Sequence, residues 1–353
     1  MAFVHQVGGH AATILASPLS SSTLIKPACA KELDWYQRIA PALLDGDFLA
    51  TWTPAFYGTL KLQGKMGDSG AVEKLDTAGD EEEAVEPEML VLENLTYRFV
   101  HPNVLDIKLG MQLYDEDASE EKQARMRKAA QSSTSGEAGV RLTGFQVWDN
   151  STSSYVQTPK PFGRTLTVPE LPLGLSRFFY PPLSGPSAAE TSDPTSFPLE
   201  TQARPPPLPL EMLLPVLRTL ARRLDDLERV MQTLEVRMRG ASLLIVVEGD
   251  AQALEAALLR AQASQTAPSE NGDEADDASV STTDSAGDAA PHTRQALDVR
   301  LIDFAHSRAV RPELGETGPD EGVLKGIGAV RGLVKGLVGE LEELERKEEA
   351  EGK

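Results

Sequence analysis

Apolar residues recur at helical and strand spacings through most of the chain, so the pattern predicts a protein that mixes helices and strands. The clearest case is the segment 210–239, where an apolar residue returns every three or four positions. These positions are Leu213, Leu217, Leu220, Leu224, Leu227, Met231 and Leu234. The spacing puts them along one face and predicts an amphipathic helix. Helices are also predicted over residues 31–44, ended by Asp45 and Gly46, and over residues 119–131 and 322–346.

Runs of β-branched and aromatic residues bounded by glycine or polar residues predict the strands. They cover residues 2–7, 23–26, 56–62, 89–92, 104–109, 144–148, 165–167, 242–248 and 299–304. The early strands enclose a single helix, whereas the later ones alternate with several. We therefore expect an α+β protein with a small β-rich lobe over residues 1–97, a larger mixed lobe over residues 98–353, and a cleft between them.

Three polar segments interrupt this pattern. Residues 64–88 are rich in Gly, Asp and Glu, residues from about 180 to 209 in Pro and Ser, and residues from about 262 to 293 in Ser, Thr, Ala and acidic side chains. Segments of this kind cannot bury enough apolar surface to offset the entropy of the chain. They are predicted to be disordered inserts, one in the first lobe and two in the second.

The charge of the chain narrows the classes of partner. The 353 residues include 54 acidic and 34 basic side chains, which gives a net charge of −20. Nucleic acids and membrane surfaces are polyanions, so we expect no direct nucleic-acid binding and no membrane association. The net charge does not exclude a small anionic ligand that is bound by a local basic patch. The single cysteine, Cys29, excludes an intramolecular disulfide, and the composition favours a soluble, intracellular protein.

The most informative stretch lies at residues 101–110. It contains Pro-x-x-x-Asp-x-Lys-x-Gly, with Asp106 and Lys108 two positions apart in a predicted strand. Alternation along a strand puts both side chains on one face, where an acid and a base can bind one anionic, hydroxyl-rich ligand. Taken alone, the pair is better interpreted as a weak surface ion pair, because such pairs are common.

Other segments add the remaining marks of a kinase site. Asp303 ends an apolar strand in Leu-Ile-Asp-Phe-Ala-His, where kinases place a magnesium ligand near the γ-phosphate. Lys26 ends a strand of the first lobe, and Glu32 lies in the first turn of the helix that follows. Residues 89–96 look like a strand that runs into an interlobe hinge.

Together these segments resemble the inositol polyphosphate kinases, and residues 102–110 with Tyr114 and Asp115 are most similar to the fungal multikinases of that family. Further similar segments are residues 5–10, 134–136, 142–147, 162–164, 241–244 and 318–322. In the fifth of these, the family's Ser-Ser-Leu-Leu has alanine at its first position, Ala241. The resemblance implies a bilobal kinase-like fold with the nucleotide between the lobes and an inositol-phosphate-binding helical segment in the larger one.

The resemblance also implies a role for each site residue. Lys26 would hold ATP phosphates, Glu93 and Leu95 would bind the adenine edge through the hinge backbone, and Asp106 would bind the ribose hydroxyls. Asp303 would bind Mg²⁺, and Lys108 and His306 would face the inositol phosphate. Lys108 and Asp303 would be the catalytic pair. No protein-kinase His-Arg-Asp loop is present, so no catalytic base is assigned.

The predicted helix 119–131 carries Lys122, Arg125 and Lys128 at three-residue spacing, which places them on one face. In so acidic a chain this cationic face suits a substrate with several phosphates. The alternative is a solvated face with internal Glu–Lys pairs. A loop cap is the favoured interpretation of Asp320, over a second acidic contact in the site.

The leading prediction is an ATP-dependent inositol polyphosphate multikinase that acts on inositol trisphosphate and tetrakisphosphate. The alternatives are an inositol hexakisphosphate kinase that makes pyrophosphates, an inositol trisphosphate 3-kinase, or a non-catalytic nuclear scaffold that keeps the kinase fold. A monomer in nucleus and cytoplasm, with transcription-complex partners, is the family expectation. The order of the hydroxyls phosphorylated is left open.

Overall fold

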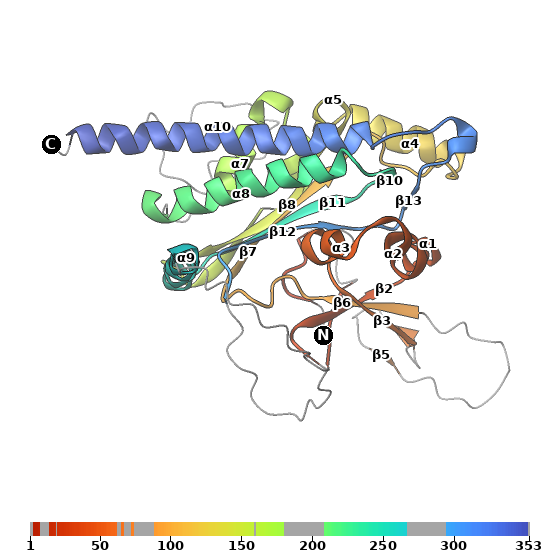
Figure 1. The fold of residues 1–353 in the computed structure, drawn as a ribbon, viewed down its shortest axis with the longest axis horizontal. Helices are drawn as coiled ribbons and strands as arrows, with labels where there is room; N and C mark the ends of the chain where they lie inside the picture. Colours follow the sequence, from red (N-terminus) through yellow and green to blue (C-terminus); the bar gives the residue numbers. More distant parts are fainter. Residues whose placement is uncertain are drawn as a thin grey trace, which may run out of the picture.

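The computed structural model describes residues 3–7, 14–18, 20–61, 65–66, 72–73, 88–158, 160–179, 208–266 and 294–351. Within them, one sheet is built from strands before residue 94 and another from strands after residue 101. In Figure 1 the first sheet and its short helices lie below the second sheet, which is covered above by long helices. The predicted lobe boundary at residues 97 and 98 falls between the two sheets.

The first sheet has four antiparallel strands in the order β1-β2-β6-β3. Their bounds are Leu15–Ala16 (β1), Thr23–Pro27 (β2), Glu88–Glu93 (β6) and Phe56–Lys61 (β3). The predicted strands 23–26, 56–62 and 89–92 are confirmed. Residues 3–7, predicted to be a strand, form none, although the Phe3 amide donates to the Ile14 carbonyl at 2.9 Å.

The helix predicted over residues 31–44 is confirmed, with an irregular middle. It consists of α1 (Ala30–Asp34), a π-helical turn η1 (Trp35–Ile39) and α2 (Ala40–Leu43). Asp45 does not simply end it: its side chain accepts a hydrogen bond from the Phe48 amide at 2.6 Å and caps the next helix, α3 (Gly46–Trp52). Sequence reasoning missed α3 because an Asp-Gly pair is typical of both a turn and a helix start.

The second sheet has five antiparallel strands in the order β12-β11-β7-β8-β9. Their bounds are Leu297–Ile302 (β12), Ser242–Glu248 (β11), Pro102–Leu109 (β7), Val140–Asp149 (β8) and Ser154–Thr158 (β9). Ser242 pairs with Lys108 on one side and with Ile302 on the other. This register brings the Asp-x-Lys motif of β7 within two strands of the Asp303 motif that follows β12.

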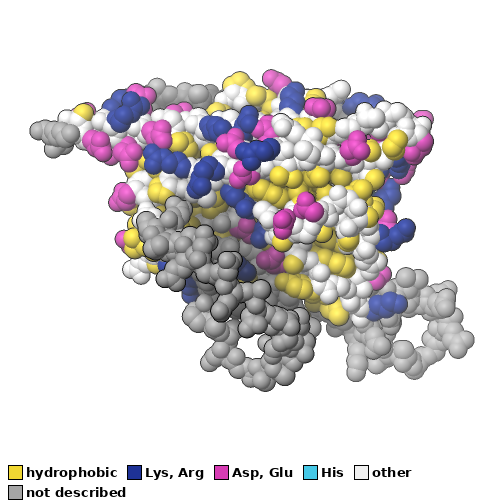
Figure 2. Space-filling model, in the orientation of Figure 1, with side chains coloured by type: hydrophobic (Ala, Val, Ile, Leu, Met, Phe, Trp, Pro, Cys, Tyr) yellow, Lys and Arg dark blue, Asp and Glu magenta, His cyan; other side chains and the backbone are white. Residues whose placement is uncertain are grey.

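Two long helices, α8 (Leu210–Met231) and α10 (Glu321–Glu351), pack together over this sheet (Figure 1). Alternate strand residues such as Leu105, Ile107 and Leu243 join the leucines of α8 in the main core. Figure 2 shows positive and negative side chains intermixed over these helices, where Arg218 pairs with Glu342 at 2.9 Å. The opposite sheet face, which carries Asp106 and Lys108, is left for the site.

The remaining elements complete the larger lobe. They are α4 (Glu120–Gln131), α5 (Thr134–Ala138), α6 (Lys160–Thr165), η2 (Val168–Glu170), α7 (Leu171–Phe179), β10 (Val236–Met238), α9 (Ala251–Thr266), β13 (Ser307–Ala309) and η3 (Pro312–Leu314). Across all these described ranges, no helix combines the length and hydrophobicity that a bilayer crossing requires.

Two predictions for this lobe were wrong. The helix predicted to reach residue 239 ends at Met231, and the chain then forms β10, which pairs with β13. A strand partner that lies about seventy residues further along the chain leaves no mark in the local spacing. The strand predicted over residues 165–167 is instead the end of α6 and the N-cap of η2, where Thr167 and Glu170 form a capping box.

The three predicted inserts lie mostly outside the described residues. In the first, the short strands β4 (Lys65–Met66) and β5 (Val72–Glu73) pair with each other. At the edges of the other two, Leu208 is buried at 6% exposure and α9 extends to Thr266. The predicted bounds of the inserts were therefore too wide at these points.

Candidate active site

A cavity of about 400 Å³ lies between the two sheets. The first sheet and its helix contribute Leu24, Lys26, Glu32 and Leu92 to its walls, and the second sheet and the segment after it contribute Val104, Asp106, Lys108, Leu244, Ile302, Asp303 and His306. Residues far apart in the sequence thus line one space. Apolar walls with a few convergent charged groups are typical of a small-molecule site.

Lys26 occupies the centre of the charged group. Its ammonium donates to Asp303 Oδ1 at 2.7 Å and to Glu32 Oε1 at 2.9 Å. The three side chains come from β2, from α1 and from the end of β12. The pairing therefore joins the two sheets across the cavity.

The protonation states follow from burial and from this pairing. Burial alone would lower the pKa of Lys26, but Asp303 and Glu32 outweigh it and raise that pKa above its usual value. Burial alone would raise the pKa of Asp303, whereas Lys26 and then Lys108 lower it. The pKa of Glu32 is raised because burial outweighs its attraction to Lys26. Lys26 and Asp303 are thus both charged at neutral pH.

The backbone at Asp303 explains how its carboxylate reaches the cavity. Asp303 has φ of +65°, a left-handed conformation that few residues other than Gly, Asn and Asp adopt. The next residue, Phe304, is fully buried and stacks on Trp35 of η1, with ring centroids 5.2 Å apart. The buried ring fixes the chain at the point where the strand turns.

The donor groups fit a nucleotide-bound Mg²⁺ ion. In the part of the chain that the structure describes, no group of three or more His, Cys, Asp or Glu side chains is arranged to hold a metal. Mg²⁺ at kinase sites takes only one or two carboxylates and completes its shell with phosphate oxygens and water. Asp303, ionised and on the cavity wall, is a suitable carboxylate.

Residues 93–96, predicted to form the hinge, also line the cavity. The Glu93 amide donates to the Ala55 carbonyl at 2.9 Å, and Asn94 Oδ1 accepts from the Thr96 amide at 3.1 Å. These bonds fix the path of the backbone. The adenine contacts predicted for Glu93 and Leu95 stay predictions. Because the Glu93 N–H already donates to Ala55, the backbone group of Glu93 left for adenine is its carbonyl.

The Asp-x-Lys motif of β7 forms the floor of the cavity. Asp106 is 3% exposed and Lys108 is half-buried, and both line the cavity, as alternation predicted. The Lys108 ammonium donates to the Gly240 carbonyl at 2.7 Å. It therefore lies near the cavity wall beside His306 and Arg239, neither of which is on its own strand.

His306 also lines the cavity. Its Nδ1 is 3.5 Å from Asp115 Oδ2, and Asp115 also accepts from Lys31 of α1. Burial and the charge of Lys122 lower the pKa of His306, while Asp115 opposes them. The ring is therefore mainly neutral at pH 7. Sequence reasoning assigned no role to Lys31 or Asp115, which lie 84 residues apart.

The basic face predicted on α4 divides in the structure. Lys122 is half-buried and close enough to His306 to lower its pKa, whereas Arg125 and Lys128 are exposed. The three do not line the cavity. Helical spacing predicted one shared face, but only the tertiary structure shows that Lys122 approaches His306. Their substrate-binding roles stay predictions.

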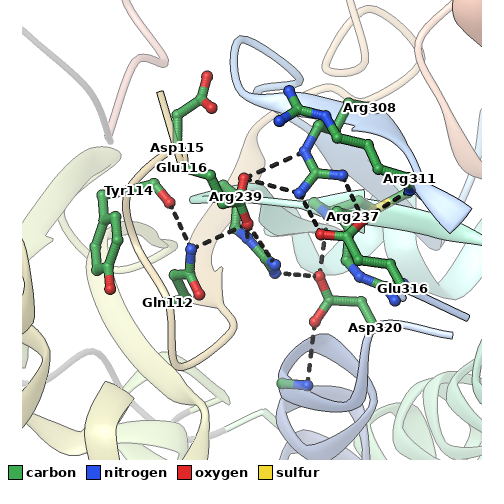
Figure 3. Close-up of polar contacts among 12 residues, drawn as sticks. Gln112, Tyr114, Asp115, Glu116, Arg237, Arg239, Arg308, Arg311, Glu316 and Asp320 are labelled. Carbon is green, nitrogen blue, oxygen red and sulfur yellow. Dashed lines mark hydrogen bonds and ion pairs between the residues drawn. The ribbon is translucent and has the colours of Figure 1, made fainter. Parts of the chain in front are cut away.

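Sequence reasoning missed Arg239, whose side chain lines the cavity and pairs with Glu116 and Asp320 (Figure 3). The cap predicted at Asp320 is confirmed: its Oδ1 accepts from the amides of Gly322 and Val323 at the start of α10. A single Arg after a short strand gives no sequence signal of such pairing.

Comparison with known proteins identifies the family of the chain. A family model described as inositol polyphosphate kinase matches residues 89–197 and 208–335. The chain belongs to the inositol polyphosphate kinase family. As a member of this family the protein is a kinase, and the resemblance found in its motifs is confirmed.

Similar proteins include multikinases and hexakisphosphate kinases. The inositol polyphosphate multikinase of Saccharomyces cerevisiae is 29% identical over 281 residues, which cover 70% of this chain and 72% of that protein. The multikinase of Schizosaccharomyces pombe is 32% identical over 50% of this chain and 62% of its own length. Human inositol hexakisphosphate kinase 1 is 28% identical over 67% of this chain and 50% of its own length.

A solved structure shows the same fold. The S. cerevisiae inositol phosphate multikinase, in complex with ADP and Mn²⁺, superposes with a TM-score of 0.58 and 26% identity, covering 90% of this chain and 99% of that one. The predicted bilobal α+β kinase fold is therefore confirmed for this inositol polyphosphate kinase family member.

Proposed function

We propose that this kinase is an ATP- and Mg²⁺-dependent inositol polyphosphate multikinase, which transfers the γ-phosphate of ATP to hydroxyls of inositol trisphosphate and tetrakisphosphate. One observation carries the proposal. One cavity is lined by the Lys26–Asp303 pair, by residues 93–96 and by Lys108 and His306. We assign the part lined by residues 93–96 and Lys26 to the nucleotide, as the nucleotide end, and the part lined by Lys108 and His306 to the acceptor, as the substrate end. A nucleotide and a phosphorylated acceptor can thus meet in one space.

Phosphoryl transfer depends mainly on positioning and on neutralising charge. Lys26 would bind the ATP phosphates, and Asp303 would hold the Mg²⁺, which supplies charge neutralisation at those phosphates. Lys108 would bind a phosphate of the acceptor. His306, neutral and oriented by Asp115, would contact the acceptor hydroxyl or its neighbouring phosphate.

The acceptor class is supported by the charges at the substrate end. Lys108 lines the cavity there and Lys122 lies close enough to His306 to lower its pKa, although the whole chain carries a net charge of −20. A local concentration of positive charge in an acidic protein suits a small ligand with several phosphates. The yeast relatives, named multikinases, match larger shares of their own length than the human hexakisphosphate kinase does.

A product profile tests the proposal. The purified chain is offered inositol tris-, tetrakis-, pentakis- and hexakisphosphate in turn, with ATP and Mg²⁺, and the products are separated by ion-exchange chromatography. We expect tetrakis- and pentakisphosphate from the trisphosphate. Pyrophosphates from the hexakisphosphate, with little turnover of the trisphosphate, would establish the hexakisphosphate kinase instead.

Two variants complete the design. Asp303→Asn should lower product formation by roughly two orders of magnitude or more. Asp34→Asn, an exposed change on α1 at the Arg38 pair, should leave it unchanged. Turnover by Asp303→Asn equal to that of the wild type would contradict the mechanism. A complete lack of product from the wild type, in a sample that melts cooperatively, would favour the scaffold alternative.

The compartment and the partners are also proposals. We infer a monomer of nucleus and cytoplasm that contacts transcription complexes through its acidic segments, because the chain is acidic and has a single cysteine. Fluorescent tagging tests the compartment, and light scattering tests whether the chain is a monomer. A dimer in solution, or exclusion from the nucleus, would contradict them.

A further inference from the structure

Arg239 lies in the short turn between β10 and β11, and its guanidinium is held at both ends (Figure 3). Nη1 donates to Asp320 Oδ2 at 2.6 Å, and Nε donates to Glu116 Oε1 at 2.9 Å. The side chain is 12% exposed, and that of Asp320 is 6% exposed. Pairs of this kind have fixed geometry, because the planar guanidinium must meet two acceptors at once.

The two carboxylates are themselves held in place. Asp320 also accepts from the Met238 amide at 3.1 Å and caps α10. Glu116 lies 3.0 Å from Arg308 Nη2, and Arg308 in turn binds Glu316 (Figure 3). The acceptors of Arg239 thus belong to a connected network of charged side chains, so they cannot simply follow the guanidinium if it moves.

The turn that carries Arg239 contacts both residues at the substrate end of the cavity. The Gly240 carbonyl accepts from the Lys108 ammonium at 2.7 Å, and the Arg239 amide donates to the His306 carbonyl at 3.4 Å. Gly240 has φ of +70°, a conformation that glycine adopts without strain. The direction of its carbonyl, and with it the position of the Lys108 ammonium, depends on how the turn is held.

We propose that Arg239 is a positioning residue for the acceptor: through the Gly240 carbonyl it aims the Lys108 ammonium at a phosphate of the inositol ring. This inference rests on the proposed function. Arg239 does not bind phosphate itself, because both edges of its guanidinium are occupied by carboxylates. Lys108, on a flexible four-carbon stem, needs such a fixed acceptor to keep one direction.

The main test is Arg239→Lys, which keeps the charge but cannot reach both carboxylates. We expect kcat/KM for the inositol phosphate to fall about tenfold to a hundredfold, the scale of losing an outer partner of a site residue. The KM for ATP should stay within about twofold, because Lys26 is held separately by Asp303 and Glu32. The matched control is Glu316→Gln, which breaks an ion pair in the same network without touching the turn.

A double-mutant cycle separates positioning from general stability. If Arg239 acts through Lys108, then Arg239→Lys should change kcat/KM by less than about twofold in a Lys108→Met background, although it has its full effect in the wild type. Should Arg239→Lys fail to fold, Asp320→Asn takes its place. The asparagine keeps a side-chain oxygen for the amide of Gly322 but removes the charge that holds Arg239.

The outcomes are distinct. A wild type that is active, with Arg239→Lys matching Glu316→Gln in both KM values, overturns the positioning role and leaves the proposed function intact. Equal loss of activity in the wild-type and Lys108→Met backgrounds also overturns it. A wild type with no transfer to any inositol phosphate overturns the proposed function together with this inference.

Discussion

The two ends of the cavity are held by different means. At the nucleotide end, Lys26 is bound directly by Asp303 and Glu32, and these residues stand in motifs that are visible in the sequence. At the substrate end, Lys108 is bound by a backbone carbonyl, whose position depends on the Arg239 turn. Substitutions at the nucleotide end should therefore act directly on chemistry, and those at the substrate end mainly through the position of Lys108.

The largest effect is expected from Asp303→Asn, which tests the nucleotide end. Asparagine keeps the size of the side chain but removes the charge that binds a hard cation. Turnover should fall by roughly two orders of magnitude or more, the scale of losing one preorganised electrostatic contact. The melting temperature should change little, since Lys26 keeps Glu32. Turnover and melting are measured on one preparation, and near wild-type turnover would overturn the assignment.

A smaller effect at the same end is expected from Glu32→Gln. The change removes one of the two carboxylates that hold Lys26, so kcat/KM for ATP should fall about tenfold, the lower end of the range for such supporting residues. The KM for the inositol phosphate should stay constant. Asp34→Asn, on the same helix but in an exposed pair with Arg38, serves as the control. A change confined to the inositol phosphate would contradict the division between the two ends.

The substrate end is tested by separating the residues of α4. Lys122→Ala should raise the KM for the inositol phosphate by about fivefold to tenfold, and the rise should shrink at high salt because salt partly screens a half-buried charge. The double variant Arg125→Ala with Lys128→Ala should change it by less than about threefold, as expected of exposed surface charges. Steady-state kinetics at two ionic strengths give the answer. Equal effects would show that the whole face binds substrate.

The smallest effect concerns His5, beside the cavity. Burial, and then the charge of His101, lower the pKa of His5 to about 4. Between its ordinary pKa near 6.5 and about 4, the unfolded state binds the proton more readily, so stability falls as the pH falls through this window. His5→Gln should reduce the drop in melting temperature between pH 6.5 and pH 4. An unchanged drop would show that other groups cause it.

The sequence predicted several of the residues that line the cavity, while their roles stay predictions. The strand predicted over residues 242–248 matches β11, and Lys26, Asp106, Lys108 and Asp303 all line the cavity. Each of these lies in a short apolar run or a spaced motif, where local alternation already decides which face a side chain takes. The same reasoning put Lys122 on one helix face but could not tell that it alone approaches His306.

The residues that sequence reasoning missed are held by partners far along the chain. Arg239 meets Glu116 across 123 residues and Asp320 across 81. The segment before it was predicted as helix from its local spacing. It forms the strand β10 instead, because pairing with β13 overrides that spacing. Even Asp303, which was found from its motif, has a left-handed backbone conformation that no residue pattern predicted.

By itself the sequence determined most of the local elements and the identity of the charged side chains, because helical and strand periodicity, caps and motifs act within a few residues. The tertiary structure decided which charges meet. Lys26 and Asp303 are 277 residues apart in the sequence, and yet Lys26 Nζ lies 2.7 Å from Asp303 Oδ1. Ion pairs gain their strength from exact distance and from burial, and both quantities arise only when the two sheets close around one cavity.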